Sequence, residues 1–110
     1  MTKTFIQTIE FSKNWDKLGF DDDDLRRLEL EIASNPQSGS VVQGTGKLRK
    51  MRFAYLNEGK RGSTRVCYVH FAIRNIIYLI TIYPKNVKDN LSKAERNAIK
   101  IMIDKLEENL

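Results

Sequence analysis

The chain has 110 residues, of which 41% are apolar, and a formal net charge of +5 at pH 7. This length and apolar content predict one globular domain over residues 1–110 and exclude an intrinsically disordered chain. The single cysteine, Cys67, excludes an intrachain disulfide, and the N-terminus lacks the apolar core of a signal peptide, so we expect a cytoplasmic protein.

One strand and two helices are predicted in the first third of the chain. Residues 4–9 are β-branched and apolar with rough alternation, which indicates a strand. Residues 11–18 carry apolar side chains at helical spacing, and Trp15 is expected to anchor the core. The four aspartates at 21–24 open a second helix, because carboxylates are stabilised in a first turn and can cap it. We prefer this interpretation to a metal site, since no His or Cys lies beside them.

Basic charge is concentrated in the middle of the chain. Residues 44–85 carry nine basic side chains and one acidic one, whereas residues 1–43 have a net charge of −3 and residues 86–110 a net charge of zero. After a loop at 38–46, apolar and basic residues alternate through a predicted strand at 47–55. Lys50 and Arg52 should therefore share one face of the sheet, opposite to Met51 and Phe53. Such a localised basic face favours a polyanionic partner.

Two more strands and a helix complete the predicted fold. A basic turn at 56–62 leads to strands at 64–71 and 76–83, and the second of these is apolar on both faces, so it should be central. It is too short to span a membrane, and we expect no membrane contact. Ser92 and Glu95 form a capping box that starts the last helix. Its core-facing stripe is predicted to contain Ala98, Ile99, Met102, Ile103 and Leu106. The order β-α-α-β-β-β-α predicts an α+β fold, a small antiparallel-rich sheet flanked by helices.

The residue types on the basic face limit the chemistry. His70 is the only histidine, and Cys67 lies three residues before it on the same strand, so the two side chains should point to opposite faces. We therefore expect neither a cysteine protease-like pair nor a metal or other cofactor. Lysine, arginine and tyrosine remain, and these can cleave RNA without a metal by using its 2′-OH as the nucleophile. Charge alone does not separate cleavage from passive nucleic-acid binding or from a solvated face.

Three collinear segments resemble the RelE/HigB family of bacterial toxins. They read GTGKLRKMRFA, GKRGSTRVCYVHF and IYLITIYPKNVKDNLSKAERNAI, and together they cover most of residues 35–101. The resemblance implies the small sheet-and-helix fold of that family. It also implies a toxin of a type II toxin–antitoxin system, a ribosome-dependent endoribonuclease that cleaves messenger RNA in the ribosomal A site. The implied partners are the ribosome, its messenger RNA and a cognate antitoxin, HigA-like with a helix-turn-helix, which brings the complex to operator DNA.

The resemblance also implies the site residues. The paired basic positions of the family's second strand match Lys50 and Arg52, the arginine opening its third strand matches Arg65, and the basic residue after its fourth strand matches Lys85. Relatives carry a C-terminal tyrosine or histidine, but the segment after Lys85 has neither, and Tyr83 is the predicted replacement. The implied contacts to the RNA backbone are made by Lys47, Arg49, Lys60 and Arg61.

Two other functions fit the same pattern. One is a ParE-like toxin that poisons DNA gyrase on the same fold, although gyrase poisoning does not require the set Lys50, Arg52 and Arg65. The other is an RNA-binding module without catalytic activity.

Overall fold

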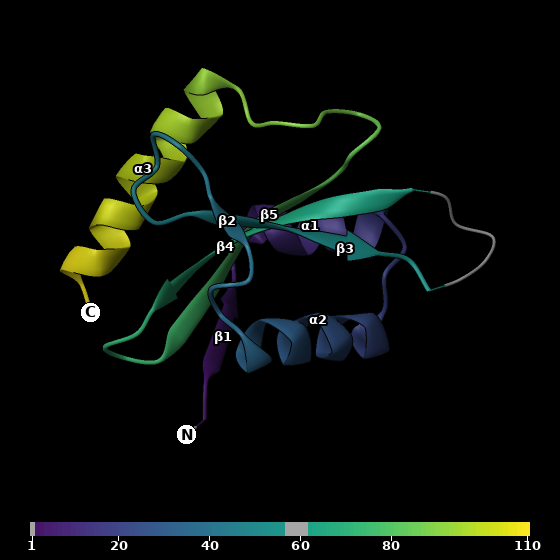
Figure 1. Cartoon of the computed structure of the whole chain (residues 1–110), viewed down its shortest axis with the longest axis horizontal. Helices are drawn as coiled ribbons and strands as arrows, with labels where there is room; N and C mark the ends of the chain where they lie inside the picture. The colour runs from purple at the N-terminus through teal and green to yellow at the C-terminus, as the bar shows by residue number, and fades with distance from the viewer. Residues whose placement is uncertain (1, 57–61) are drawn as a thin grey trace.

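The structure is a computed structural model that describes residues 2–56 and 62–110. Over these residues it forms a five-stranded sheet with three helices (Figure 1). In chain order the elements are β1 Thr4–Gln7, α1 Ile9–Lys17, α2 Asp22–Ser34, β2 Ser40–Val41, β3 Arg49–Ala54, β4 Ser63–Phe71, β5 Ile76–Pro84 and α3 Lys93–Glu108. The sheet order is β1-β5-β4-β3-β2, and β1 pairs with β5 in parallel while the other pairs are antiparallel. The predicted α+β class is confirmed.

One face of the sheet packs against α1 and α2 through a cluster of aromatic side chains. Trp15 is 5% exposed, and its ring stacks on Phe11, Phe20 and Phe53 at centroid distances of 5.5, 4.5 and 5.8 Å. Phe53 projects from β3 into this cluster, whereas its neighbour Arg52 is exposed on the other side. The predicted alternation along this strand is therefore confirmed, and so is the core position of Trp15.

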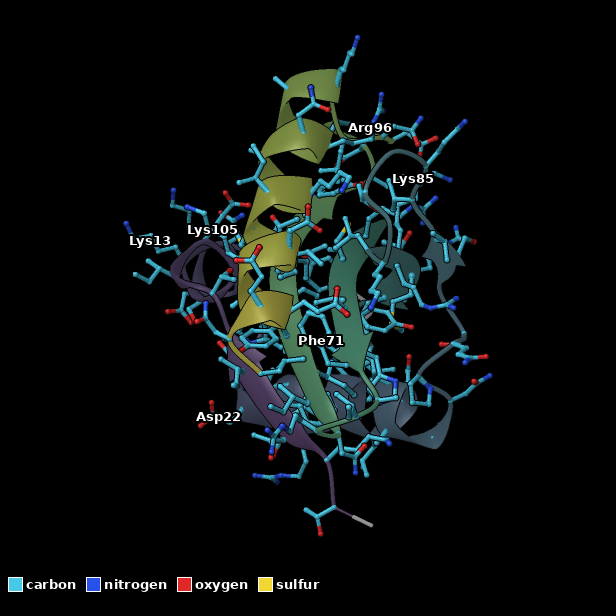
Figure 2. All side chains as sticks on the ribbon, turned by 90° about the vertical axis from the view of Figure 1, so that its left-hand side faces the viewer. Lys13, Asp22, Phe71, Lys85, Arg96 and Lys105 are labelled. Atoms are coloured by element: carbon cyan, nitrogen blue, oxygen red, sulfur yellow. The ribbon has the colours of Figure 1, made fainter. Side chains whose placement is uncertain are left out.

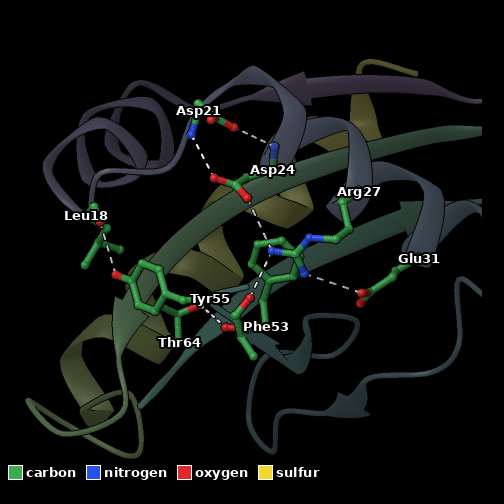
Figure 3. A network of polar contacts seen from close by, with 9 residues as sticks. Leu18, Asp21, Asp24, Arg27, Glu31, Phe53, Tyr55 and Thr64 are labelled. Atoms are coloured by element: carbon green, nitrogen blue, oxygen red, sulfur yellow. Dashed lines mark hydrogen bonds and ion pairs between the residues drawn. The ribbon is translucent and has the colours of Figure 1, made fainter. Parts of the chain in front are cut away.

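The aspartate tract caps α2, as predicted. Asp21 is the N-cap, and its carboxylate accepts from the backbone N–H of Asp24 while the Asp24 carboxylate accepts from the N–H of Asp21 (Figure 3). These bonds hold the pKa of Asp21 below its ordinary value. One turn further on, Arg27 lies 4.0 Å above the Phe53 ring and donates to the carbonyl of Ala54 at 2.9 Å. The start of α2 thereby fixes the end of β3.

The opposite face of the sheet packs against α3. Ser92 and Glu95 form the predicted capping box at the start of this helix. Ile99 and Ile103 are buried against the sheet, but Met102 is 38% exposed and Ala98 is exposed, so the predicted stripe was too wide. The reason is that Ala98 and Met102 line an open cleft between α3, β5 and the start of α1, which the described residues do not fill. β5 lies between β1 and β4 with buried side chains on both faces, as predicted.

Two features of the sheet were not predicted. The two-residue strand β2 lies inside the segment expected to be a loop, and it pairs with Lys50 and Arg49. Gly39, just before β2, allows this close approach, because a Cβ there would lie 2.9 Å from the carbonyl oxygen of Lys50. The second feature is the parallel pairing of β1 with β5, which joins the two ends of the fold.

A bulge in β5 gives the sheet its final register. The pairing with β4 shifts between Cys67 and Tyr68, which leaves Ile80 as the extra residue of β5. The carbonyl of Ile80 accepts a hydrogen bond of 2.7 Å from the Thr8 hydroxyl. After the bulge, Tyr83 packs on the α3 side of the sheet together with Cys67. In the part of the chain that the structure describes, no helix is long and apolar enough to cross a membrane.

Candidate nucleic-acid interface

The strand register brings most of the predicted catalytic residues together. Arg52 on β3 lies opposite Arg65 on β4, and Arg65 lies opposite Tyr83 on β5. Lys50 is two residues before Arg52 and therefore on the same face of β3. Lys85 follows β5 directly, and its backbone N–H donates to the carbonyl of Ser63 at 3.0 Å. These residues form a basic row on the α3 side of the sheet, beyond the start of that helix.

The connection from β5 to α3, residues 85–92, lies over part of this row. Asp89 Oδ1 is 3.4 Å from Arg65 Nη2, and the Arg65 side chain is only 15% exposed. Lys50 Nζ donates to Asn90 Oδ1 at 2.8 Å and lies 3.4 Å from the carbonyl oxygen of Asp89. Two of the predicted catalytic cations are therefore already in contact with oxygen atoms of the protein. In Arg65 one terminal nitrogen of the guanidinium already faces a carboxylate.

An open cleft of about 740 Å³ lies between the end of β3, the start of β4 and the start of the connection. We call it the Arg52–Lys85 cleft, after the two cations that line it. Arg52 Nε donates to the Ser63 hydroxyl at 3.2 Å, and the Arg52 side chain is exposed. Lys85 is exposed on the opposite wall. A phosphodiester in this cleft would have a cation on each side.

Tyr83 occupies the row but has little contact with solvent. It is 5% exposed, and Lys88 lies 4.9 Å above its ring. Burial, followed by the neighbouring Cys67 thiol, raises the pKa of the Tyr83 hydroxyl far above its ordinary value of 10. A hydroxyl of this kind keeps its proton at neutral pH, and the covered ring presents no free face to an RNA base. The predicted role of Tyr83 in stacking or proton transfer stays a prediction, and this geometry does not favour it.

Cys67 lies behind the row and is fully buried. Burial raises the pKa of its thiol to about 12. We expect iodoacetamide at pH 8 to label the unfolded chain and to leave the folded protein unmodified, because only the thiolate reacts. Since the folded pKa exceeds the unfolded one, the free energy of unfolding should be insensitive to this thiol below about pH 8.5 and should decrease as pH rises further. Rapid labelling of the folded protein, followed by mass spectrometry, would contradict this prediction.

Two of the four predicted RNA-binding residues, Lys47 and Arg49, lie outside the row. Lys47 forms an ion pair with Glu107 near the end of α3 and lies 5.9 Å from the centroid of the Phe71 ring. Arg49 is on the other face of β3, where it donates to the carbonyls of Gly39 at 2.7 Å and Gln37 at 3.3 Å. These contacts hold the fold together, and a role in RNA binding stays a prediction for both. Lys60 and Arg61 lie outside the described residues.

The connection 85–92 is the part of the site that sequence reasoning missed. Asp89 and Asn90 contact the predicted catalytic cations Arg65 and Lys50. The sequence patterns predicted no role for them, because the resemblance singled out this segment only as the place where relatives carry a tyrosine or histidine. The signal available in the sequence was one acid and two amides, Asp89, Asn86 and Asn90, within the six residues that follow β5. Among residues 2–56 and 62–110, no three His, Cys, Asp or Glu side chains are grouped closely enough to hold a metal ion.

The fold matches solved structures of one toxin. A double arginine-to-alanine mutant of the E. coli toxin RelE in the free state has a TM-score of 0.56 and 13% identity, over 81% of this chain and 90% of that one. The isolated E. coli RelE toxin has a TM-score of 0.53 and 13% identity, over 92% and 99%. The intact E. coli RelBE toxin–antitoxin complex gives 0.55 and 11%, over 76% and 96%. At such identities these matches show the fold alone.

Sequence comparison with family models adds the evolutionary relation. The model of the RelE toxin of the RelE/RelB toxin–antitoxin system matches residues 3–109, almost the whole chain. The predicted resemblance is thereby confirmed at the level of the family. This chain belongs to the RelE toxin family.

Proposed function

We propose that this protein is the toxin of a type II toxin–antitoxin system and acts as a metal-independent endoribonuclease on messenger RNA in the ribosomal A site. The observation that carries the proposal is the cross-strand pair of Arg52 and Arg65, which shares one face of the sheet with Lys50 and lies beside an open cleft that Arg52 and Lys85 line. Family membership supports the toxin assignment. The ribosome and its messenger RNA are the proposed partners because a basic surface of this size fits a polyanion.

Arginine and lysine can carry out the reaction if the substrate provides the nucleophile. The 2′-oxygen attacks the adjacent phosphorus, the bond to the 5′-oxygen breaks, and a 2′,3′-cyclic phosphate and a 5′-hydroxyl form. The Arg65 guanidinium would bind two non-bridging oxygens and stabilise the charge that they gain in the transition state. In this proposal, Lys50 and Lys85 would exchange protons with the attacking and leaving oxygens.

Asp89 must leave Arg65 before a phosphate can bind there. Asp89 is 61% exposed and the ion pair is long at 3.4 Å, so it should contribute only about 1 kcal/mol, and breaking it should weaken RNA binding only modestly. We expect Asp89→Asn to lower the toxin concentration needed for half-maximal cleavage by about two- to fivefold, because the competing charge is removed. The measurement is a toxin titration in a translation extract. A variant that binds ribosomes normally but cleaves less would show instead that the Asp89 carboxylate takes part in the reaction.

An antitoxin is the proposed regulatory partner. One of the solved structures that resembles this chain is a toxin–antitoxin complex, which supports a protein partner of this kind. We propose a HigA-like antitoxin with a helix-turn-helix that neutralises the toxin in the cytoplasm and carries the complex to operator DNA. Co-expression of the protein encoded by the neighbouring reading frame should restore growth, and that protein should co-purify with this chain.

Primer extension in a translation extract tests the proposed function. Purified protein is added to translating ribosomes, and messenger 5′ ends are mapped beside a reaction that contains free RNA. We expect cuts within the reading frame only when ribosomes translate. Intact messenger with normal translation would contradict the proposal, and inhibition of gyrase supercoiling would then support a ParE-like toxin. RNA binding without cuts would support a non-catalytic RNA-binding module.

A further inference from the structure

A second basic cleft lies at the far end of the connection 85–92. Its volume is about 750 Å³, and its walls come from β2 and the segment after it, from β3 and from the first turns of α3. Three cations line it, Lys50, Lys93 and Arg96, together with the amide side chains of Gln43, Asn90 and Asn97. No carboxylate is among the described residues that line this cleft. We call it the Lys50–Arg96 cleft.

The cations of α3 in this cleft differ from their neighbours in charge pairing. Lys88 pairs with Glu95 at 2.5 Å, Lys100 pairs with Asp104 at 3.0 Å, and Lys47 pairs with Glu107. Within the described parts of the chain, neither Lys93 nor Arg96 forms an ion pair. Their charge is therefore available to an anionic ligand.

A backbone carbonyl of the connection holds the Arg96 guanidinium. Arg96 Nη1 donates to the carbonyl of Leu91 at 3.0 Å. Gly44, which also lines the cleft, has a φ of +84°, a conformation that favours glycine. A guanidinium fixed in this way loses little side-chain entropy when it binds a phosphate.

Lys50 belongs to both parts of the basic face. It lines the Lys50–Arg96 cleft, and it shares its face of β3 with Arg52, which lines the Arg52–Lys85 cleft. The connection 85–92 runs from one cleft to the other, with Lys85 and Asn86 in the first and Asn90 and Leu91 in the second. Figure 2 shows Lys85 and Arg96 toward the same end of the molecule, while Lys105, on the same helix as Arg96, lies away from both.

We propose that the Lys50–Arg96 cleft binds the messenger strand next to the cleaved phosphate, with Lys93 and Arg96 on backbone phosphates and the amides of Gln43 and Asn97 on bases. This inference rests on the proposed function, because it extends the strand away from Arg65. A single strand fits better than a duplex, since the amide groups that line the cleft can bind the edges of unpaired bases. The cleft thereby contributes to the choice of sequence at which the toxin cuts.

Photocrosslinking tests the position of the strand. Asn97→p-benzoylphenylalanine places a photoreactive group on the lip of the cleft, and Lys105→p-benzoylphenylalanine on the same helix is the control. Both proteins are irradiated in a translation extract, and cuts and crosslinks are mapped on the same transcript by primer extension. We expect the Asn97 variant to give messenger crosslinks at a constant offset from the cut, and the Lys105 variant to give none.

The outcomes separate the two proposals. Cuts without messenger crosslinks, or crosslinks to ribosomal RNA alone, would overturn the assignment of the cleft and leave the endoribonuclease intact. Messenger crosslinks without cuts would keep the cleft and overturn the endoribonuclease. Absence of both would overturn both.

Salt dependence gives an independent measure with ordinary side chains. Ribosomes are programmed with a 2′-O-methylated message, which cannot be cut, and the affinity of labelled toxin is measured at increasing salt. The slope of log affinity against log salt is negative, and each phosphate contact to a single strand adds about 0.7 to its magnitude. The K93A/R96A variant should therefore have a slope whose magnitude is smaller by about 1.4. K105A should leave the slope unchanged. Equal slopes for K93A/R96A and the unmodified protein would overturn the inference.

Discussion

Replacing Arg65 by alanine is expected to lower the rate of messenger cleavage by about 10²–10³-fold and to leave the fold intact. Removal of one positioned donor to a transition-state oxyanion has an effect of this size in other enzymes. The fold should persist because Arg65 forms only a partly exposed ion pair with Asp89, which stabilises the protein by at most about 1 kcal/mol. The measurement is single-turnover cleavage on translating ribosomes, followed by primer extension.

Two further variants make the Arg65 result specific. Arg65→Lys keeps the charge but lacks the planar fork that binds two oxygens, so it should recover only part of the activity. Arg74→Ala removes an exposed arginine from the turn between β4 and β5 and should cleave like the unmodified protein. If Arg65→Ala and the unmodified protein cleave equally fast, Arg65 takes no part in catalysis and at most contributes to RNA binding.

The largest expected effect on stability is that of Trp15→Ala. Trp15 packs against three aromatic rings from α1, the following loop and β3, so its removal leaves a cavity at the centre of one face of the sheet. Truncation of a buried tryptophan costs about 3–5 kcal/mol, a large share of the 5–15 kcal/mol that stabilises a typical domain. We expect partial unfolding at 37 °C and a lower urea midpoint by circular dichroism.

Circular dichroism is needed for this variant because Trp15 is the only tryptophan and its fluorescence is lost with it. Leu30→Ala is a suitable control, since Leu30 lies on α2 and is 67% exposed. The control should change the free energy of unfolding by less than about 0.5 kcal/mol. A Trp15→Ala protein as stable as the control would mean that the aromatic cluster does not hold α1 against the sheet.

The sequence predicted those helix starts that are determined by residues close together in the chain. The Ser92–Glu95 box gave the start of α3, and the aspartates gave the start of α2, because each cap is formed within four residues. β2 was missed because two residues have no periodicity, and its pairing depends on the space left by Gly39. The exposure of Met102 could not be predicted either. An apolar residue at helical spacing has the same sequence pattern whether or not another part of the fold covers it.

The site was predictable where strand alternation applies and unpredictable where partners come from elsewhere. Lys50, Arg52 and Arg65 share a face because side chains alternate along paired strands. Lys47 and Arg49 carry the same positive charge in the sequence as the residues of the row. The fold, however, brings Glu107 to Lys47 and the carbonyl of Gly39 to Arg49, and neither contact can be read from the sequence. The cations of the Lys50–Arg96 cleft lie partly outside the basic middle segment, so charge counting along the chain did not group them.

The parallel pairing of β1 with β5 sets the order in which a nascent chain can fold. Thr4 pairs with Ile76, so the first strand has no partner until most of the chain has been synthesised. Arg65 is likewise opposite Tyr83, and the basic row is complete only after β5 has left the ribosome. At about 5–20 residues per second, several seconds separate the synthesis of β1 from that of β5. A nascent chain in which β5 is still missing therefore has neither a partner for β1 nor a complete basic row.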